Sequence, residues 1–296
     1  MTREVFIVGC GYTGLRVARR ELERGARVQA LVRSSAAAER LRTVGIEPLV
    51  GDLDVGASLV ALSLDGVVIY YFVPPPAHGV DDPRLRALLD AIGPRARPRR
   101  VVLLSTTGVY GDCGGIWVDE ERAPNPQTDR ARRRLAAERQ LHAWAHTCDV
   151  PFAILRVAGI YGPGRLPIER LRQGSPVLRE VESPWSNRVH VDDLAAACLA
   201  AADHDSSGRV YNISDGHPTT MTDYFNRVAD ACGLPRPPEI SMAQARTALS
   251  AEMLSYLSES RRIDNTRMRS ELGVVLRYPT LADGLRACTE AIAGQP

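Results

Sequence analysis

A glycine-rich segment near the amino terminus constrains the fold of this chain more than any other feature. The hexapeptide GCGYTG occupies residues 9–14, directly after the apolar run Val5–Val8 and at the start of a helical pattern. In a strand–turn–helix unit, Gly9 permits the tight turn, Gly11 lets the backbone approach a pyrophosphate, and Gly14 lets the helix pack closely on the strand. The segment therefore predicts a βαβ unit that binds a dinucleotide.

The helix after this turn supplies the chemistry for holding phosphates. Its first residues present backbone N–H groups that have no partner within the helix, and the positive end of the helix dipole favours an anion. A glycine-rich turn without a ligand is the simpler interpretation, but the strand before it and the helix after it favour dinucleotide binding. We expect the cofactor to be held by Gly9, Gly11, Tyr12, Thr13 and Gly14.

The residue after the second apolar run, Val28–Val32, indicates the type of cofactor. An acidic residue there would accept hydrogen bonds from the ribose of NAD, but the sequence has Arg33 followed by two serines. A cation suits a 2′-phosphate, so Arg33 favours NADP, with NAD as the alternative. An arginine that only lies along the surface would carry no such meaning. Asp52, after the third strand, is placed to reach the adenine amino group, or else is only a turn residue.

Short apolar runs alternate with helical patterns through the first half of the chain. The runs that predict strands are Val5–Val8, Val28–Val32, Pro48–Val50, Val67–Val73, Val101–Leu104 and Phe152–Val157, with one more strand expected near 209–213. This alternation predicts an α/β fold with a Rossmann-type, doubly wound parallel sheet. We expect residues 1–160, with a further strand and helix near 187–213, to form the dinucleotide-binding core. Residues 161–186 and 214–296 should form a small C-terminal substrate lobe over the carboxyl edge of the sheet.

Composition argues against several other classes of protein. The formal net charge of +2 offers no basic field for nucleic acid, and no stretch approaches the ~20 apolar residues of a membrane span. The six cysteines form no CxxC pair and no metal-ligand spacing is evident, so we expect reduced thiols, no metal and a cytoplasmic protein. All 37 basic residues are arginines, and the chain contains no lysine.

Small hydroxyl residues follow the run Val101–Leu104 in the segment STTGVYG, residues 105–111. At the carboxyl end of a central parallel strand they face the ligand crevice. The chain resembles the extended short-chain dehydrogenase/reductase family, in its epimerase and dehydratase branch. The resemblance is carried by the glycine-rich turn, STTGVYG, LRVAGIYGPGR at 155–165, RVHVDDL at 188–194 and YNIS at 211–214. It spans nearly the whole chain and implies an NAD(P)-dependent enzyme.

The catalytic residues of that family are matched only in part. The resemblance places its catalytic serine or threonine at Thr106, its tyrosine at Arg130 and its lysine at Arg134, four residues before Glu138. Arg134 can still supply positive charge and bond the nicotinamide ribose. Arg130 cannot replace a phenol as proton donor, because a guanidinium does not release its proton at accessible pH. It could instead bind an anionic substrate or stabilise developing negative charge.

Other side chains near the expected crevice have structural explanations. Tyr110 and Tyr161 are expected to pack in buried loops. His190 is a candidate general acid, but its segment is better explained as a strand end in which Asp192 or Asp193 caps the next helix. We therefore assign catalysis to none of these residues.

An atypical subset of the family keeps the cofactor turn but lacks the tyrosine and lysine, and this chain resembles that subset most. We expect an NADP-dependent oxidoreductase of the epimerase/dehydratase type, acting through Thr106, Arg130 and Arg134. Its small-molecule substrate would be sugar-nucleotide-like or anionic. A non-catalytic NADP-binding sensor, or a subunit of a complex, is the alternative.

The resemblance also implies a way of associating. In the family, the long helix that here carries the arginines often joins a four-helix dimer interface. A homodimer with Leu135, Leu141 and Trp144 at its interface is therefore expected.

Overall fold

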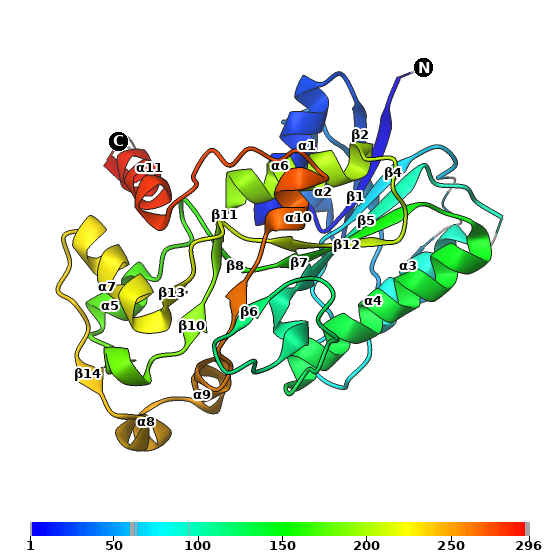
Figure 1. Ribbon diagram of the computed structural model, residues 1–296. Helices are drawn as coiled ribbons and strands as arrows, with labels where there is room; N and C mark the ends of the chain where they lie inside the picture. Colours follow the sequence, from blue (N-terminus) through cyan, green and yellow to red (C-terminus); the bar gives the residue numbers. More distant parts are fainter. Residues whose placement is uncertain (1, 60–61, 63, 94, 294–296) are drawn as a thin grey trace.

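A seven-stranded parallel sheet forms the centre of the protein (Figure 1). The structure, a computed structural model, describes residues 2–59, 62, 64–93 and 95–293. The strands run in the order β12-β7-β5-β4-β1-β2-β3, so the direction in which the chain adds strands reverses between β1 and β4. This confirms the Rossmann-type α/β fold, including the strand expected near 209–213. The strand bounds are Glu4–Val8 (β1), Arg27–Val32 (β2), Glu47–Val50 (β3), Val68–Tyr71 (β4), Arg100–Thr106 (β5), Phe152–Val157 (β7) and Arg209–Ile213 (β12).

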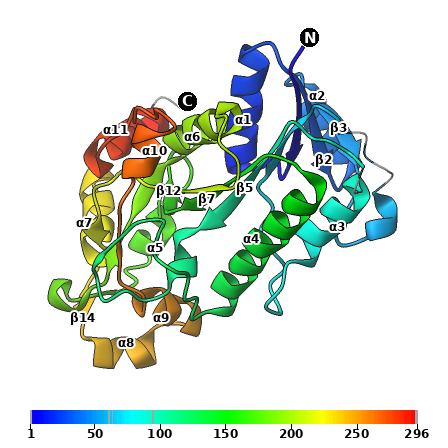
Figure 2. The same cartoon turned by 45° about the vertical axis from the view of Figure 1, so that its right-hand side comes forward.

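Helices cover both faces of the sheet (Figure 2). Successive side chains of a strand point to opposite faces, so Val5 and Ile7 of β1 pack in one layer while Phe6 and Val8 pack in the other. The first layer contains α1 (Tyr12–Glu23), α2 (Ser35–Arg42) and α6 (Val191–Asp203), and the second contains α3 (Pro83–Ile92) and α4 (Asp129–Cys148).

Helix α4 packs against the chain's own core along much of its length. Leu141 is fully buried and Leu135 is 7% exposed, while Trp144 is partly covered by the same layer. The prediction that Leu135 and Leu141 form a dimer interface is therefore wrong. Leu141 packs in the layer that covers the sheet and Leu135 is buried within the chain, whereas Trp144 keeps a larger share of free surface.

A buried ion pair ties α4 to the sheet. The carboxylate of Glu138 accepts hydrogen bonds from Arg156 of β7, with a distance of 2.8 Å from Nη2 to Oε2, and from the Ser105 hydroxyl of β5. Both charged side chains are almost inaccessible to solvent. Because Glu138 lies one turn after Arg134, this pair also fixes the position of Arg134 above the sheet.

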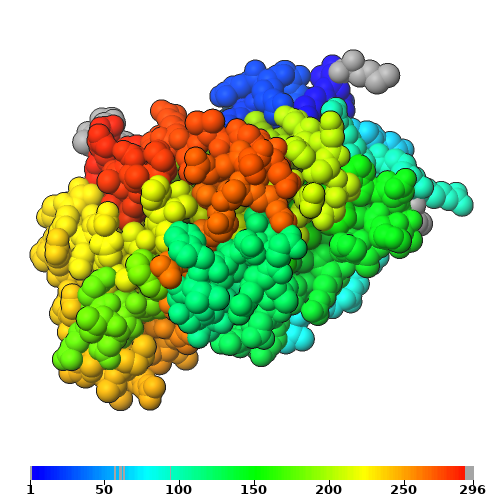
Figure 3. All heavy atoms as spheres, in the orientation of Figure 1, coloured from blue at the N-terminus to red at the C-terminus, as the bar shows by residue number. Residues whose placement is uncertain are grey.

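The remaining elements form a lobe beside the carboxyl edge of the sheet. Helices α5 (Ile168–Arg172), α7 (Met221–Ala231) and α11 (Leu281–Ala293) share a small apolar core, and α8 (Met242–Ala248) and α9 (Ala251–Leu257) lie at the outer side. The strand β15 (Arg262–Ile263) pairs with β6 (Trp117–Val118), and the space-filling view shows these two parts of the chain in contact (Figure 3). The lobe is therefore tied to the loop that follows β5. No described helix has the length and apolarity of a membrane-crossing segment.

Candidate functional site

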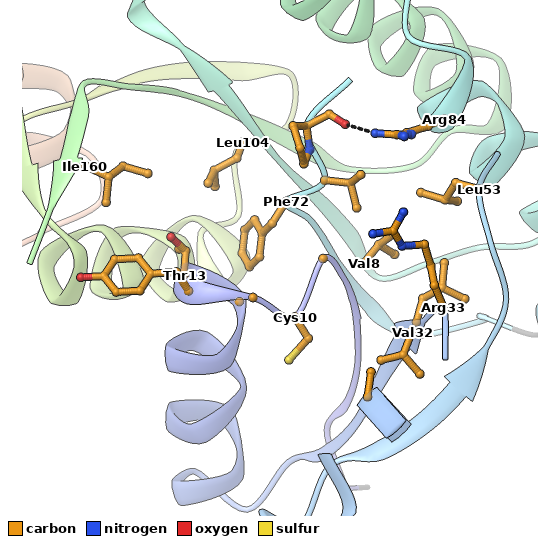
Figure 4. A pocket seen from close by; sticks show the side chains of 18 of the residues that line it. Val8, Cys10, Thr13, Val32, Arg33, Leu53, Phe72, Arg84, Leu104 and Ile160 are labelled. Atoms are coloured by element: carbon orange, nitrogen blue, oxygen red, sulfur yellow. Dashed lines mark hydrogen bonds between the residues drawn. The ribbon is translucent and has the colours of Figure 1, made fainter. Parts of the chain in front are cut away.

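A cavity of about 930 Å³ runs along the carboxyl edge of the sheet, beside the point where the strand order reverses (Figure 4). Cys10 and Thr13 mark the glycine-rich turn, Arg33 the end of β2, and Leu104 and Ile160 the opposite end. Doubly wound sheets bind dinucleotides in a crevice at this position. The volume lies within the range of small-molecule and cofactor sites.

Two of the three glycines are required by the fold itself. Gly9 has a φ of 100°, and a Cβ added there would lie 2.9 Å from the Val73 amide nitrogen. A Cβ at Gly14 would lie only 2.4 Å from the carbonyl oxygen of Gly9. The turn therefore closes tightly against β4 and against the first turn of α1.

Gly11 is different, because nothing lies within 4 Å of a Cβ built there. Its φ is −96°, outside the left-handed region, and it lines the cavity. The missing side chain is therefore not needed for packing. It leaves open a cradle at the N-terminus of α1, which fits a pyrophosphate group that must approach the backbone.

Tyr12 and Arg165 lie beside this cradle, and Arg165 adds its positive charge to that of the N-terminus of α1. The Tyr12 hydroxyl donates to the Pro163 carbonyl oxygen at 3.0 Å, and the Arg165 guanidinium lies 4.6 Å from the centroid of the Tyr12 ring. Within the described residues Arg165 has no ion pair, and it lines the cavity. Sequence reasoning did not single out Arg165, although it lies in the quoted GPGR segment.

The other end of the cavity is basic near β2. Arg33 lines it together with Ser34, whose hydroxyl caps α2 by accepting from the Ala37 amide, and with Arg40 in the last turn of α2. Asp52 also lines the cavity, and its Oδ1 accepts from the Asp54 amide at 3.0 Å. Sequence reasoning missed Arg40, because its approach to Arg33 depends on how α2 packs.

The carboxylate of Asp54 is already neutralised at this end of the cavity. It forms an ion pair with Arg84, with 2.6 Å from Nη2 to Oδ2. Arg33 has no ion-pair partner in the described chain. The two arginines of the β2 end, Arg33 and Arg40, therefore remain available to an anionic ligand.

Arg134 and Thr106 lie at the far end of the same cavity. The Arg134 Nη1 donates to the carbonyl oxygens of Val73 at 3.1 Å and Leu104 at 3.2 Å, and burial lowers the pKa of its guanidinium. The Thr106 Oγ1 accepts a hydrogen bond from the Gly108 amide at 3.1 Å. Arg134 thus holds the ends of β4 and β5 together and still faces the cavity.

Arg130 lies further out than Arg134. Its Nη1 donates to the Ser255 hydroxyl at 2.5 Å, and its guanidinium lies 3.7 Å from the centroid of the Tyr256 ring. It is not among the described residues that line the two cavities, whereas Tyr256 lines the second. The structure therefore places a phenol from α9 beside Arg130.

A second cavity of about 340 Å³ continues from the first into the lobe. Thr106 and Ile160 line both cavities. The walls on the lobe side carry two arginines, a glutamate and three aromatic rings: Arg188, Arg261, Glu259, Trp185, Tyr224 and Tyr256. A ligand in this space would lie against Thr106 and against the end of the cavity that Arg134 lines.

The segment around His190 is structural, but not in the predicted way. The His190 ring itself caps α6, with its Nδ1 accepting from the Asp192 amide at 3.2 Å. The carboxylate of Asp193 instead accepts from the amides of Arg277 and Tyr278. The prediction that Asp192 or Asp193 caps the helix is therefore wrong, because Asp193 turns toward the C-terminal segment. Burial lowers the pKa of His190 to about 4, which keeps the ring neutral and able to accept.

The two tyrosines considered at the sequence level are buried. Tyr110 is 1% exposed and its hydroxyl donates to Asn212 Oδ1 at 2.8 Å. Tyr161 is 0% exposed and packs in the core of the lobe. Neither lines either cavity, so their expected packing role agrees with their positions.

A buried carboxyl close to Arg188 gives the fold a measurable pH dependence. Burial raises the pKa of Asp215 from 3.8 to about 7. The folded state therefore binds this proton more tightly than the unfolded state. The resulting stabilisation is complete below about pH 4 and is lost as the pH rises to about 7.

Asp215→Asn is expected to remove this pH dependence while keeping the Oδ1 that accepts from the His217 amide. Relative to the variant, the wild type should lose up to ~4 kcal/mol of unfolding free energy between about pH 4 and pH 8. Urea unfolding of both proteins at each pH measures the difference between their unfolding free energies. Ionisable groups that both proteins share contribute equally and cancel in this difference. A constant difference across the range would contradict the raised pKa.

Comparison with known proteins places the chain in a family. The model of the NAD dependent epimerase/dehydratase family matches residues 5–214. The chain belongs to this family. It is also 29% identical to Protein YeeZ of Escherichia coli (strain K12), over 94% of this chain and 97% of YeeZ. It is 28% identical to a 3-diazoavenalumate denitrifying reductase of a Streptomyces species, over 88% of this chain and 92% of the reductase.

A solved structure supports the fold over the full length of this epimerase/dehydratase family member. The structure of a functionally unknown conserved protein from Silicibacter pomeroyi superposes with a TM-score of 0.85 at 35% identity, covering 99% of this chain and 100% of that one. The lobe is therefore part of a shared architecture, and the two cavities lie between parts that both chains contain.

Proposed function

We propose that this protein is an NADP-dependent oxidoreductase that acts on a small molecule held in the second cavity. The observation that carries the proposal is the continuity of the two cavities through Thr106. The first offers the glycine-lined cradle for a dinucleotide, and the second offers a polar, aromatic space beside it. The Streptomyces relative is described as a reductase, which supports redox chemistry for this chain.

The preference for NADP rests on charge at the β2 end of the cavity. Arg33 and Arg40 line it, Arg33 has no ion-pair partner in the described chain, and the neighbouring carboxylate of Asp54 is already paired with Arg84. A guanidinium pair suits a 2′-phosphate through charge-assisted hydrogen bonds. NAD would leave both cations without an anionic partner.

Arg33→Asp is expected to weaken NADPH binding by about 10–100-fold, since a hydrogen bond to a charged group contributes ~1.5–3 kcal/mol. NADH affinity should stay the same or increase, because an aspartate can accept from the free ribose hydroxyls. Calorimetric titration with each cofactor gives the ratio of NADPH affinity to NADH affinity. Arg19→Asp, an exposed arginine of α1, is the matched control and should change neither value. An unchanged ratio in Arg33→Asp would contradict the NADP assignment.

The residues around Thr106 suggest how the chemistry is divided. When bound, the nicotinamide supplies or accepts a hydride. The Thr106 Oγ1 already accepts from Gly108, so its own proton is free to donate to a substrate oxygen. Arg134 contributes positive charge at the same end of the cavity and can bond the ribose of the cofactor.

Tyr256 is the residue we assign to exchange the proton with the substrate oxygen. It lines the second cavity together with Thr106, and the Arg130 guanidinium lies over its ring. A guanidinium over the face of an aromatic ring is attracted to it, so Arg130 holds the Tyr256 ring in position. In the reducing direction, the π bond of the substrate carbonyl opens as its carbon receives the hydride. The carbonyl oxygen takes the proton as the Tyr256 O–H bond breaks, and solvent returns a proton to Tyr256.

NADPH oxidation over a panel of ketones, aldehydes, carboxylated carbonyl compounds and nucleotide sugars tests the proposal. We expect turnover with at least one class. For that substrate, Tyr256→Phe should lower kcat by about 10²–10⁴-fold while leaving NADPH affinity unchanged. Val181→Phe, at a fully exposed lobe position, is the control and should keep activity.

Tight NADPH binding without turnover of any compound would instead favour a non-catalytic NADP sensor or complex subunit. One observation supports that second candidate. A nitrogen of Arg134 is bonded to the carbonyl oxygens of Val73 and Leu104, a role that stabilises the fold whether or not catalysis occurs.

A further inference from the structure

The second cavity contains a cation without a matching anion. Arg188 lines this space, and its guanidinium lies 4.0 Å from the centroid of the Tyr224 ring. It donates hydrogen bonds to the Asn187 carbonyl oxygen at 2.8 Å and to the Met221 sulfur at 3.4 Å, and it also interacts with the Tyr224 hydroxyl. None of the described carboxylates lies within ion-pair distance of it. Burial accordingly lowers the pKa of Arg188.

The other charges around the cavity do not compensate Arg188. Glu259 is 5% exposed, and its Oε2 is paired with Arg261 at 2.9 Å, so these two cancel. Asp215 lies close enough to influence Arg188, but burial raises the pKa of its carboxyl to about 7, so it is only partly ionised at neutral pH. Of the two arginines that line the cavity in the described chain, Arg188 is therefore the one without an ion-pair partner.

Polar atoms that lack partners mark where a ligand would bond. The Oε1 of Glu259 and the Nε of Arg261 are both buried without a hydrogen-bond partner. Such groups cost free energy unless something satisfies them. Trp185 and Tyr256, which are 37% and 42% exposed, supply flat apolar surface on the same walls.

We infer that the second cavity binds a small, planar monocarboxylic acid, with its carboxylate on Arg188. The guanidinium presents a planar fork that matches a carboxylate, and one arginine without an ion-pair partner matches one anionic group. A nucleoside diphosphate sugar would bring two phosphates into a space that offers one uncompensated cation. The unpaired Glu259 oxygen would accept a hydrogen bond from a hydroxyl or N–H group of the acid. This inference rests on the proposed function, since it names the substrate class of that site.

Binding of cinnamate to the NADP⁺-saturated protein tests the inference, with cinnamamide as the uncharged analogue and UDP-glucose as the diphosphate. We expect cinnamate to bind at least tenfold more tightly than cinnamamide and more tightly than UDP-glucose. Arg188→Gln should abolish the preference for the carboxylate, and Arg188→Lys should keep part of it. Arg179→Gln, an exposed arginine of the lobe, should bind like the wild type.

Equal affinity for cinnamate and cinnamamide, or an undiminished preference in Arg188→Gln, would overturn the inference. Tighter binding of UDP-glucose than of the carboxylate would overturn it as well, in favour of a nucleotide-sugar site. NADPH titration of each protein distinguishes failure of this inference from failure of the proposed function. Normal NADPH binding without carboxylate preference removes only this inference, whereas loss of NADPH binding in the wild type removes the proposed function. Melting curves of the variants verify that they are folded. If Arg188→Gln does not fold, Arg188→Lys still tests whether this side chain sets the preference for the carboxylate.

Discussion

Gly11→Ala is expected to weaken NADPH binding on the order of 100-fold while leaving the stability of the free protein within ~0.5 kcal/mol of the wild type. The reason is that a Cβ at this position meets no protein atom within 4 Å, so the unliganded fold tolerates it. The same methyl group enters the cradle where a pyrophosphate must approach the backbone. Calorimetric titration with NADPH and urea unfolding measure the two quantities.

Two further glycines serve as controls for this experiment. Gly14→Ala should lower both affinity and stability, because its Cβ would lie 2.4 Å from the Gly9 carbonyl oxygen. Gly56→Ala, where a Cβ also meets nothing within 4 Å but which does not line the cavity, should change neither. If Gly11→Ala bound NADPH as tightly as the wild type, the turn would not hold the diphosphate.

Glu138→Gln is expected to destabilise the protein by ~3–5 kcal/mol, the usual cost of removing one partner of a buried ion pair. Glu138 accepts from Arg156 and from the Ser105 hydroxyl, and both members of the pair are almost fully buried. The variant leaves the Arg156 guanidinium charged in a site without solvent. Thermal and urea unfolding should record the loss, with a melting temperature lower by roughly 10 °C.

An exposed pair provides the comparison. Glu39→Gln removes the partner of Arg42 on the surface of α2, where an ion pair contributes at most ~1 kcal/mol. The double variant Glu138→Gln, Arg156→Met should recover part of the stability lost by Glu138→Gln, because no unpaired charge remains buried. If Glu138→Gln alone unfolded with a free energy no lower than that of Glu39→Gln, α4 would not be anchored through the Glu138–Arg156 pair.

The core of the fold could be predicted from the sequence because its signals are local. The apolar runs that end at Val8, Val32 and Val157 become parallel strands, and the glycine spacing of residues 9–14 becomes the turn between β1 and α1. The ends of the strands are harder to predict, because hydrogen bonding to neighbouring strands decides them. For example, β5 extends from Arg100 to Thr106, beyond the apolar residues 101–104. The interface expected for Leu141 rests on the family resemblance, which does not show what this side chain covers in this chain. It packs in the layer that covers the sheet.

The site was predictable where it lies on the sheet and unpredictable where the lobe contributes. Thr106, Arg134 and Arg33 line the cavity because Thr106 ends a strand, Arg33 follows one and Arg134 lies on the helix beside the sheet. Arg188 and Tyr256 come from segments far apart in the chain, and only the packing of α9 brings Tyr256 beside Arg130. His190 shows the same limit, because the choice between ring and carboxylate as helix cap depended on where Asp193 found the amides of Arg277 and Tyr278.

Titration of the purified, dialysed wild type with NADPH and with NADH is the decisive measurement. The cavity at the carboxyl edge of the sheet predicts saturable one-to-one binding of NADPH, at least tenfold tighter than NADH, with heat and a fluorescence change that in Gly11→Ala both require on the order of 100-fold more NADPH. No heat and no fluorescence change with either cofactor would mean that the cavity is not a dinucleotide site, and the roles given to Arg33, Thr106 and Arg134 would fail with it.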